Sequence, residues 1–511
     1  MHQPTLAFLA AAAWLALSAH AQPQHSDLWG KNGESWSASG RLPDVSFAGY
    51  ACGEIPLPSP PVRANVRDFG AKGDGSNDDS AAFLAAIANT RSGAIFIPAG
   101  RYKITKILEI NKPGIVLRGE GPEKTILVCP VPLNEIQPDW GATSSGIRTS
   151  NYSWSGGIVW FQGNNPRKWI ARSTTAAKRG DREILLQSVP KGLSPGDWIE
   201  ISLRDDSAKS LLDHLYSGDS GKLNSISHSN HTTSFVSRVT KIKGKVLTLE
   251  RPLRTDLRPE WKPQISTFNP TVSHSGIEEL AFEFPQRSYG GHFTELGFNA
   301  VSFNNVVHCW ARNLSIINSD SGIFAAGRFC TITGIHLKLC ENTQETRNVF
   351  GHHGVSLTGH DNLFTRFHIE QRFIHDITVT RGAGNVASAG RATDLSLDHH
   401  KRAPYDNVFT DIDSGAGSRI WKSGGGSDLG RNCGAHGTFW NIRATQALKH
   451  PGGFGPPSMN LVALQSNEPS ITQANGIWFE AIDPARIDPP NLHDAQLARR
   501  TRSSMPSPAP R

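Results

Sequence analysis

Imidazole and carboxylate side chains recur at a fixed spacing of 23 residues in the second half of the chain. The two series run one residue apart and comprise His352, His375 and Asp398 in the first and His353, Asp376 and His399 in the second. A neutral imidazole is a general base near neutral pH, and a carboxylate can orient it or transfer protons itself. Acid–base chemistry on a bound substrate is therefore the first function that these residues indicate.

The spacing gives each series a place in space if one turn of a repeating fold uses 23 residues. Each series then becomes a column of ionisable groups about 5 Å apart, which is the distance between neighbouring strands. Adjacent strand residues face opposite sides, so one column points inward and the other outward. Burial of such groups costs free energy unless every group is paired, and we therefore expect an outward column that lines a groove.

The segment from His352 to Arg402 is rich in His and Arg, which suits β-elimination of a uronic-acid chain. In that reaction a base removes the proton α to a carboxylate, and a cation holds the carboxylate and stabilises the developing negative charge. The candidate catalytic residues are His353, His375, Asp376, Asp398, His399 and His400. The candidate substrate-binding residues are Asp320, His352, Arg366, Lys401, Arg402, Trp421 and Lys422.

Other interpretations of these residues remain open. A glycoside hydrolase would use two carboxylates on either side of the glycosidic bond. The available carboxylates are Asp376, Asp398, Asp411 and Asp413. A glycan-binding protein without catalysis would use exposed aromatic platforms, for which Trp421 and Trp440 are candidates. A His/Asp cluster can also hold a divalent metal, but no HExxH-like motif marks a site, so the metal ligands stay unassigned.

The elements that must position these residues repeat along the chain. From about residue 271 to residue 444 the sequence consists of short β runs joined by turns that contain Asn. Asn362, Asn385 and Asn407 follow one another at spacings of 23 and 22 residues. A period in the low twenties is typical of a solenoid, and one turn of three short strands uses about that many residues. Asn at equivalent corners is expected to form a ladder of hydrogen bonds.

A second pattern lies at residues 65–121, NVRDFGAKGDG…IFIPAGRY…LRGEG. Asp78, Asp79 and Ser80 can cap a helix whose apolar face carries Phe83, Leu84 and Ile87, and short β runs follow. This order resembles the opening of the pectate-lyase-3-like, rhamnogalacturonase–epimerase-like superfamily. The resemblance implies an all-β fold, a right-handed parallel β-helix with an N-terminal capping helix, and activity on a polysaccharide. It also makes calcium a plausible cofactor, although no dedicated calcium loop is evident.

A further resemblance concerns the polygalacturonases, which are β-helices with Asn-Thr-Asp, Asp-Asp, Gly-His-Gly and Arg-Ile-Lys motifs. NSDSGI at residues 318–323, GHHGVS at 351–356 and RIWK at 419–422 are similar to three of these motifs. The Asp-Asp motif is missing, because the sequence between Asp320 and His352 contains no other Asp. The hydrolase assignment is therefore not transferred, and Asp320 remains a candidate by position alone.

These patterns divide the chain into successive parts. Residues 1–21 are read as a signal peptide because an apolar run ends in Ala19-His20-Ala21, which predicts export. The remaining parts are a Pro-rich lead (22–61), an N-terminal cap with the first coils (62–165), an inserted β subdomain (166–265), the main coils (266–445), a C-terminal cap (446–490) and a disordered basic tail (491–511). The insertion is expected to wall the groove.

Composition adds limits rather than a function. The net charge of +7 includes four Arg in the last thirteen residues, so an acidic partner is allowed but not required. No basic stripe with interleaved aromatics supports nucleic-acid binding, no segment after the signal reaches membrane-spanning length, and the six cysteines form no CxxC pair. The sequence thus predicts a secreted polysaccharide-degrading enzyme, a lyase on an acidic polysaccharide in preference to a hydrolase, and leaves its oligomeric state open.

Overall fold

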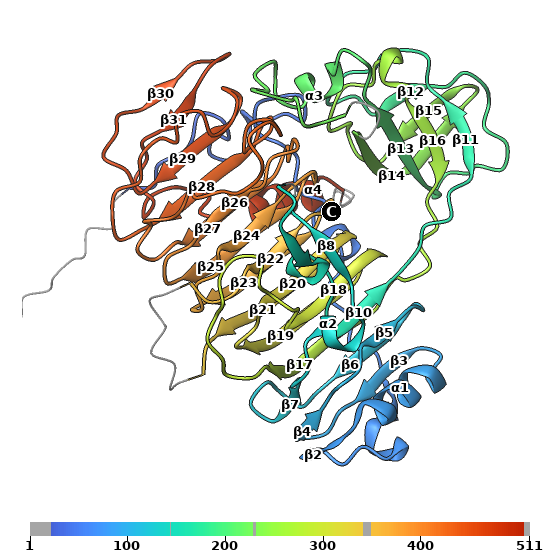
Figure 1. Cartoon of the computed structure of the whole chain (residues 1–511). Helices are drawn as coiled ribbons and strands as arrows, with labels where there is room; N and C mark the ends of the chain where they lie inside the picture. Colours follow the sequence, from blue (N-terminus) through green and yellow to red (C-terminus); the bar gives the residue numbers. More distant parts are fainter. Residues whose placement is uncertain (1–21, 144, 228–230, 341–348, 505–511) are drawn as a thin grey trace, which may run out of the picture.

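The computed structural model describes residues 22–143, 145–227, 231–340 and 349–504, so the predicted signal peptide lies outside the described residues. The chain forms a right-handed parallel β-helix whose coils run from β1 near the N-terminus to β31 near the C-terminus (Figure 1). An inserted subdomain stands beside the coils. The predicted fold class is confirmed.

Two parallel sheets make up the coils within the described residues. The large sheet contains, in spatial order, β1 (Val62–Asn65), β3 (Gly93–Phe96), β6 (Ile115–Arg118), β17 (Gly276–Glu283), β19 (Trp310–Ile317), β21 (Thr331–Lys338), β23 (Leu363–Ile369), β25 (Val386–Ala392), β27 (Val408–Asp413), β28 (Thr438–Arg443), β29 (Asn460–Leu464), β31 (Trp478–Glu480) and β30 (Ile471–Thr472), with β2 (Asp74–Asp78), β4 (Gly100–Lys103) and β7 (Thr125–Val128) attached. The second sheet contains β5 (Leu108–Ile110), β10 (Val159–Gln162), β18 (Asn299–Val307), β20 (Ser321–Arg328), β22 (His353–Leu357), β24 (His375–Val379) and β26 (Leu397–His399).

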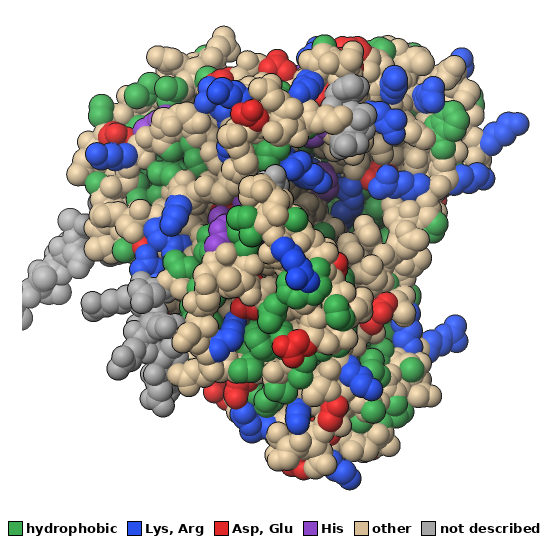
Figure 2. Space-filling model, in the orientation of Figure 1, with side chains coloured by type: hydrophobic (Ala, Val, Ile, Leu, Met, Phe, Trp, Pro, Cys, Tyr) green, Lys and Arg blue, Asp and Glu red, His purple; other side chains and the backbone are tan. Residues whose placement is uncertain are grey.

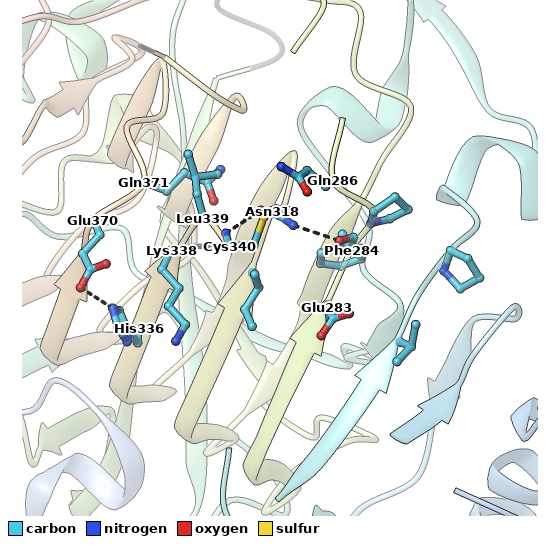
Figure 3. Close-up of a pocket in the computed structure, with 14 residues that line it drawn as sticks. Glu283, Phe284, Gln286, Asn318, His336, Lys338, Leu339, Cys340, Glu370 and Gln371 are labelled. Atoms are coloured by element: carbon cyan, nitrogen blue, oxygen red, sulfur yellow. Dashed lines mark hydrogen bonds and ion pairs between the residues drawn. The ribbon is translucent and has the colours of Figure 1, made fainter. Parts of the chain in front are cut away.

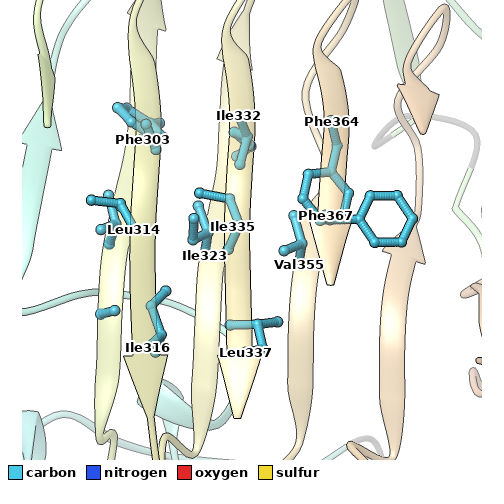
Figure 4. Packing of buried hydrophobic residues seen from close by; sticks show 14 of the residues in the cluster. Phe303, Leu314, Ile316, Ile323, Ile332, Ile335, Leu337, Val355, Phe364 and Phe367 are labelled. Atoms are coloured by element: carbon cyan, nitrogen blue, oxygen red, sulfur yellow. The ribbon is translucent and has the colours of Figure 1, made fainter. Parts of the chain in front are cut away.

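The space between the two sheets is filled by apolar side chains that repeat from coil to coil (Figure 4). On the large sheet Leu314, Ile335 and Phe367 stand in register on three successive strands. On the second sheet Ile323 and Val355 do the same. Burial of each such side chain stabilises the fold by roughly 1.5–3 kcal/mol, and the β-branched residues suit the strands.

The predicted Asn ladder is present at the corner that follows the second sheet. Asn385 Oδ1 accepts hydrogen bonds from Asn362 N and Asn362 Nδ2, each at 3.1 Å. Asn385 itself donates to Asn407 Oδ1 from its backbone N at 3.0 Å and from Nδ2 at 3.1 Å. The ladder gives partners to buried backbone N–H groups that the turn takes out of the strand pairing.

Removal of one rung is expected to lower stability measurably. In Asn385→Ala the N–H of Asn362 loses its acceptor while it remains buried, and we expect a loss of about 2–4 kcal/mol in the free energy of unfolding, measured by urea denaturation. The control is Asn224→Ala, whose amide makes an exposed contact with Asp428, for which we expect a change within about 0.5 kcal/mol. Equal midpoints for the two variants would contradict a stabilising ladder.

Residues 169–267 form a separate antiparallel sheet, shown in green at the upper right of Figure 1. Its strands, in spatial order, are β11 (Trp169–Arg172), β16 (Gln264–Thr267), β13 (Trp198–Arg204), β14 (Thr232–Lys243), β15 (Val246–Leu249) and β12 (Glu183–Leu185). Its core also includes Tyr405 and Leu429 from the coils. The insertion therefore packs directly against the segments that follow the second sheet.

Helices are short and peripheral. They comprise α1 (Ser80–Asn89), α2 (Leu133–Ile136), α3 (Ser210–His214) and α4 (Leu492–Ser504), beside the hairpin strands β8 (Trp140–Ala142) and β9 (Arg148–Ser150). In α1, Phe83 and Ile87 are buried in the main core, next to the first coils. None of the described helices is long and apolar enough to cross a membrane.

The prediction of a disordered tail after residue 490 is wrong for α4. The many Arg residues suggested a solvated segment, but Leu492 is buried in a cluster with Trp29 and Trp440. Arg500 stacks over Phe47, with the guanidinium carbon 4.0 Å from the ring centre. The lead and α4 thus cover the outer face of the large sheet together, and Trp440, predicted to be an exposed platform, is fully buried.

The region predicted as a C-terminal cap continues the coils. Strand β29 pairs in parallel with β28, and β31 pairs in parallel with β29. The solenoid is therefore longer than the repeat visible in the sequence. The reason is that the connection before β29 is long and irregular, which hides the period.

Candidate active site

Histidines gather on the outer face of the second sheet, around β22, β24 and β26. The cluster consists of His292, His352, His353, His375, His400 and Asp398. The ring centres of His352 and His353 are 4.1 Å apart, and that of His375 lies 5.1 Å from His353. All of these residues except His292 were candidates from the sequence, and the structure brings them together in a different alignment from the predicted one.

The predicted 23-residue register is wrong. His353 stands opposite His375, whereas Asp398 stands opposite Thr378 and His399 opposite Val379. The step between strands is therefore 22 residues from β22 to β24 and 20 from β24 to β26. Turn lengths differ between coils, and each residue added to or removed from a turn shifts the register of the following strand.

The carboxylate of Asp398 is the centre of the cluster and is fully buried. Its Oδ2 lies 2.9 Å from His400 Nδ1 and 3.3 Å from His375 Nδ1, and it accepts a hydrogen bond from Thr378 Oγ1 at 3.1 Å. Its Oδ1 accepts from Gly424 N at 2.7 Å. Burial alone raises a carboxyl pKa, but His375, His400 and Gly424 outweigh it and lower the pKa of Asp398 to about 2. Asp398 is therefore ionised at neutral pH.

The buried imidazoles of the cluster are neutral at the same pH. Burial lowers the pKa of His375 to about 4 and holds the pKa values of His352 and His353 well below the ordinary value. These residues lie in the interior of the site, which differs from the exposed column expected from the sequence. Some of their ring nitrogens have hydrogen-bond partners. His353 Nδ1, for example, lies 3.0 Å from Thr378 Oγ1.

Of the two histidines beside Asp398, His400 is the one that reaches solvent, because its side chain is 34% exposed. The ionised Asp398 carboxylate beside Nδ1 favours the tautomer that carries its proton on Nδ1. The lone pair then resides on Nε2. His400 is thus arranged as a base whose orientation a buried carboxylate fixes.

A loop of residues 284–298 between β17 and β18 contributes His292 and Glu295, which the sequence did not identify. His292 Nε2 lies 3.0 Å from His352 Nε2, and Glu295 accepts a hydrogen bond from Tyr289. Neither residue belongs to the repeat, and only their position before a coil of the repeat could have suggested them. Long irregular loops often carry functional residues, but their sequence does not show where they fold.

Asp320, predicted to bind substrate, instead holds this loop in place. Its Oδ2 accepts hydrogen bonds from Gly297 N at 3.1 Å and Phe298 N at 2.9 Å, and its Oδ1 pairs with Arg287. The side chain is buried, so it positions His292 through the backbone and does not reach a substrate.

Asp376 and His399, both predicted to be catalytic, are structural. Asp376 is buried and accepts hydrogen bonds from Arg419 Nη2 and Ser396 N, each at 2.7 Å. The ring of His399 lies among Phe409, Phe439 and Phe454 in the core, with ring centres 5.0–5.4 Å apart. These two predictions are wrong because a period fixes spacing but not which side a residue faces when the register shifts.

Three predicted substrate-binding residues lie apart from the cluster. Arg366 is on the large sheet, where it lines a shallow hollow with Asp411 and Asp413. Trp421 and Lys422 line another hollow, and the Trp421 ring packs edge-on against Phe439. The structure does not join these side chains to the histidines.

Lys401 and Arg402 follow His400 in a loop with an unusual backbone. Lys401, Arg402 and Ala403 have φ values of 61°, 65° and 55° in succession. Such conformations cost about 1–3 kcal/mol each and persist only when their surroundings hold them. Ala403 N donates to Tyr216 Oη of the insertion at 2.7 Å, and Lys401 Nζ donates to Gly426 O at 2.9 Å. The insertion thus fixes the basic loop beside His400.

The molecular surface is hollowed between the insertion and the coils, with histidine side chains inside the hollow and Lys and Arg side chains along its rim (Figure 2). Arg381 lies near Arg402, since burial and then the charge of Arg381 lower the pKa of the Arg402 guanidinium. An anionic ligand is therefore favoured at this face.

A separate cleft of about 670 Å³ lies at the carboxyl ends of β17, β19 and β21 (Figure 3). Its lining includes Glu283, Lys338 and Glu370. Arg101 Nη2 lies 2.7 Å from Glu283 Oε1, and His336 Nε2 lies 2.9 Å from Glu370 Oε1. This cleft belongs to the large sheet, and two of its carboxylates are already paired, Glu283 with Arg101 and Glu370 with His336.

Calcium, which the family resemblance made plausible, does not fit the histidine cluster. Ca²⁺ takes six to eight oxygen ligands. The carboxylates here are buried and held by other groups: Asp398 by His375 and His400, Asp376 by Arg419, and Asp320 by Arg287. The ligand set that the cluster offers consists mainly of nitrogen.

Comparison with protein families gives one match. Residues 63–156 match the model of the family described as "Rhamnogalacturonase A/epimerase, pectate lyase-like". The match covers the segment from which the resemblance was inferred and confirms it. It includes α1 and the first coils but ends before the histidine cluster.

Comparison with individual proteins gives partial matches. Over 104 residues the chain is 31% identical to mannuronan C5-epimerase AlgE1 of Azotobacter vinelandii. The matched segment is 19% of this chain and 7% of that protein. Among solved structures, the tailspike protein gp49 from Pseudomonas phage LKA1 has a TM-score of 0.45 and 13% identity, with coverage of 81% of this chain and 68% of that chain. An alginate lyase from Paenibacillus sp. str. FPU-7 has a TM-score of 0.37 and 10% identity, with coverage of 82% and 98%.

Proposed function

We propose that this protein is an exported enzyme that acts on a uronic-acid polysaccharide by removing the proton α to a sugar carboxylate, and that it completes the reaction as a lyase. The observation that carries the proposal is the Asp398–His400 pair: a buried, ionised carboxylate 2.9 Å from the Nδ1 atom of a partly exposed imidazole. Such a pair is a positioned general base.

The residues around the pair supply the other parts of the reaction. His400 Nε2 takes the proton, and Lys401 and Arg402, beside it in the chain, hold the sugar carboxylate and stabilise the negative charge that develops. The electrons of the broken C–H bond form a carbon–carbon double bond as the glycosidic C–O bond breaks. The leaving oxygen takes up a proton, which the protonated His400 can return.

The burial of the carboxylates supports proton removal over hydrolysis. A hydrolase needs two carboxyl groups in contact with the glycosidic bond. Around the cluster, Asp398 is 0% exposed, Asp376 1%, and Asp320 and Glu295 3% each. These side chains are closed off from a substrate, whereas the His400 side chain is 34% exposed.

A second candidate function is C5-epimerisation of a polyuronate. The partial match to a mannuronan C5-epimerase favours it. Epimerisation begins with the same proton removal but returns a proton to the opposite face of the sugar, so the glycosidic bond stays intact. The same base and the same carboxylate-binding cations serve both reactions.

The test is to incubate the full-length protein in D₂O with a panel of polyuronates. We expect the ultraviolet absorbance of an unsaturated product without deuterium at the carbon α to the carboxylate, because that carbon becomes part of the double bond, and loss of the absorbance in His400→Ala. His368→Ala, on the large sheet, is the control and should keep wild-type rates. Deuterium without absorbance would indicate epimerisation. New reducing ends without either signal, or binding without any turnover, would overturn the proposal.

A further inference from the structure

Three imidazoles of the cluster converge on one point. His292, His352 and His375 each offer a ring nitrogen, and these three nitrogens lie within 4.8 Å of one another. The Nε2 atoms of His292 and His352 are 3.0 Å apart. In a tetrahedral zinc site with Zn–N bonds of about 2.0–2.1 Å, ligand nitrogens are roughly 3.4 Å apart, so small ring rotations would complete such a site.

Part of this group lacks the partners that buried polar atoms normally have. Among the described residues, His375 Nε2 has no hydrogen-bond partner although the atom is buried. Unpartnered buried polar atoms are rare, and a nitrogen of this kind is available to bind a cation. Two facing imidazole nitrogens also need either a shared proton or a common cation.

The atoms behind the rings provide an independent observation. Metal-ligating histidines usually direct their other ring nitrogen at a carboxylate or carbonyl, which fixes the ring and increases its basicity. His375 Nδ1 lies 3.3 Å from Asp398 Oδ2, and His352 Nδ1 lies 3.7 Å from Glu295 Oε2. A carboxylate therefore stands behind each of the two buried rings, close enough to support it after a small shift, although neither ring nitrogen makes a hydrogen bond to it in this structure.

A rival trio on the large sheet lacks these features. His336, His368 and Glu370 also offer three grouped ligand atoms, but Glu370 is exposed and the two histidines are only partly buried. Arg391 Nη2 lies 3.3 Å from His368 Nδ1, the same nitrogen that faces Glu370. A fixed positive charge beside a ligand nitrogen opposes cation binding.

We propose that His292, His352 and His375 form a binding site for one divalent transition-metal ion of the zinc class. Asp398 then supports both the ion, through His375, and the base, through His400. In that position the ion would add to Lys401 and Arg402 in holding the carboxylate of the sugar next to the base and in taking up its negative charge. This role rests on the proposed function, whereas binding of the ion does not.

The experiment is calorimetric titration of chelator-treated full-length protein with Zn²⁺, and visible spectroscopy with Co²⁺. We expect one ion per chain and the absorption of a tetrahedral Co²⁺ site. His292 lies in a loop, so its replacement leaves the core intact. His292→Ala should weaken binding by about 100-fold or more. Glu295→Gln, which removes support from His352, should weaken it by about 10-fold. His368→Ala is the control and should bind like wild type.

The outcomes separate this inference from the proposed function. Absence of Zn²⁺ binding, wild-type binding by His292→Ala, or loss of binding in His368→Ala would each overturn the site. Circular dichroism of each variant checks that the fold is retained. Because binding is measured without substrate, a chain that binds Zn²⁺ as expected but forms neither an unsaturated product nor a deuterated sugar from any polyuronate keeps the metal site and refutes the proposed function alone.

Discussion

Replacement of Asp398 by Asn is expected to reduce kcat by about 10³–10⁴-fold. The amide has nearly the same shape, but it no longer stabilises the tautomer of His400 that carries the proton on Nδ1. It also removes the negative charge that stabilises the imidazolium formed when His400 takes a proton. The measurement is the initial rate of proton exchange or of unsaturated product on the substrate identified from the panel.

Two controls make the Asp398 result interpretable. Asp413→Asn changes an exposed carboxylate on the large sheet that accepts a hydrogen bond from Gly415 N, and we expect its rate to stay within about 2-fold of wild type, as for a surface substitution away from the site. Thermal unfolding of Asp398→Asn shows whether the variant is folded at the assay temperature. A folded Asp398→Asn protein with a rate within about tenfold of wild type would refute the assignment of the Asp398–His400 pair as the base.

Replacement of Asp361 by Asn is expected to lower the free energy of unfolding by about 3–5 kcal/mol. Asp361 is buried at a corner of the coils between two arginines of the insertion. Arg251 Nη2 lies 2.6 Å from its Oδ1 and Arg251 Nη1 3.1 Å from its Oδ2, while Arg254 Nη1 lies 3.4 Å from Oδ2. Without the carboxylate, the buried Arg251 has no counter-charge, and Arg254 keeps only the longer contact between its Nε and Asp406 Oδ2, at 3.8 Å.

Asn suits this test because Asp361 has a φ of 57°, a conformation that Asn tolerates better than most residues. The measurement is urea denaturation followed by circular dichroism. The control is Asp219→Asn, which removes the partly exposed pair with Arg431 and should change stability by less than about 1 kcal/mol. Similar losses in both variants would show that burial of the Asp361 pair has no special effect.

The pH dependence of the Asp361 contribution has a definite sign. Burial raises the pKa of this carboxyl, but Arg251 and Arg254 outweigh burial and hold its pKa well below the ordinary value. A group with a lowered folded pKa stabilises the fold above its unfolded pKa, about 3.9, and loses that effect as the pH falls through the folded value. The difference between wild type and Asp361→Asn should therefore persist at pH 5.

Much of the fold was predictable because the β-helix repeats its physical requirements. Asn362, Asn385 and Asn407 occupy the same corner in successive coils, and the same turn selects the same residue each time. The helix with Phe83 and Ile87 and the strands after it were equally visible, because their apolar patterns are local. A segment such as α4 was not predictable in this way, because its stability comes from contacts with a lead more than 400 residues earlier.

The candidate site was only partly predictable, for a related reason. The repeat pointed to His352, His353, His375 and Asp398, which do meet. It placed Asp376 and His399 beside them, because nothing in a period shows that one turn is two residues shorter than the last. His292 and Glu295 lie outside the repeat altogether. The chemistry therefore combines regular coils with one irregular loop, and only the coils leave a signal in the sequence.

The inserted subdomain also has a consequence for how the chain reaches its folded state. Strand β6 lies before the insertion and β17 after it, yet they are neighbours in the large sheet, and Arg118 pairs with Glu278, 160 positions later in the chain. The coils on either side of this junction can each form from nearby residues, but the junction must close a long loop before its contacts yield any free energy. Joining of the two halves of the solenoid is therefore the step at which assembly should be slowest, and the exposed edges of β6 and β17 are the places where an incompletely folded chain would associate with another copy.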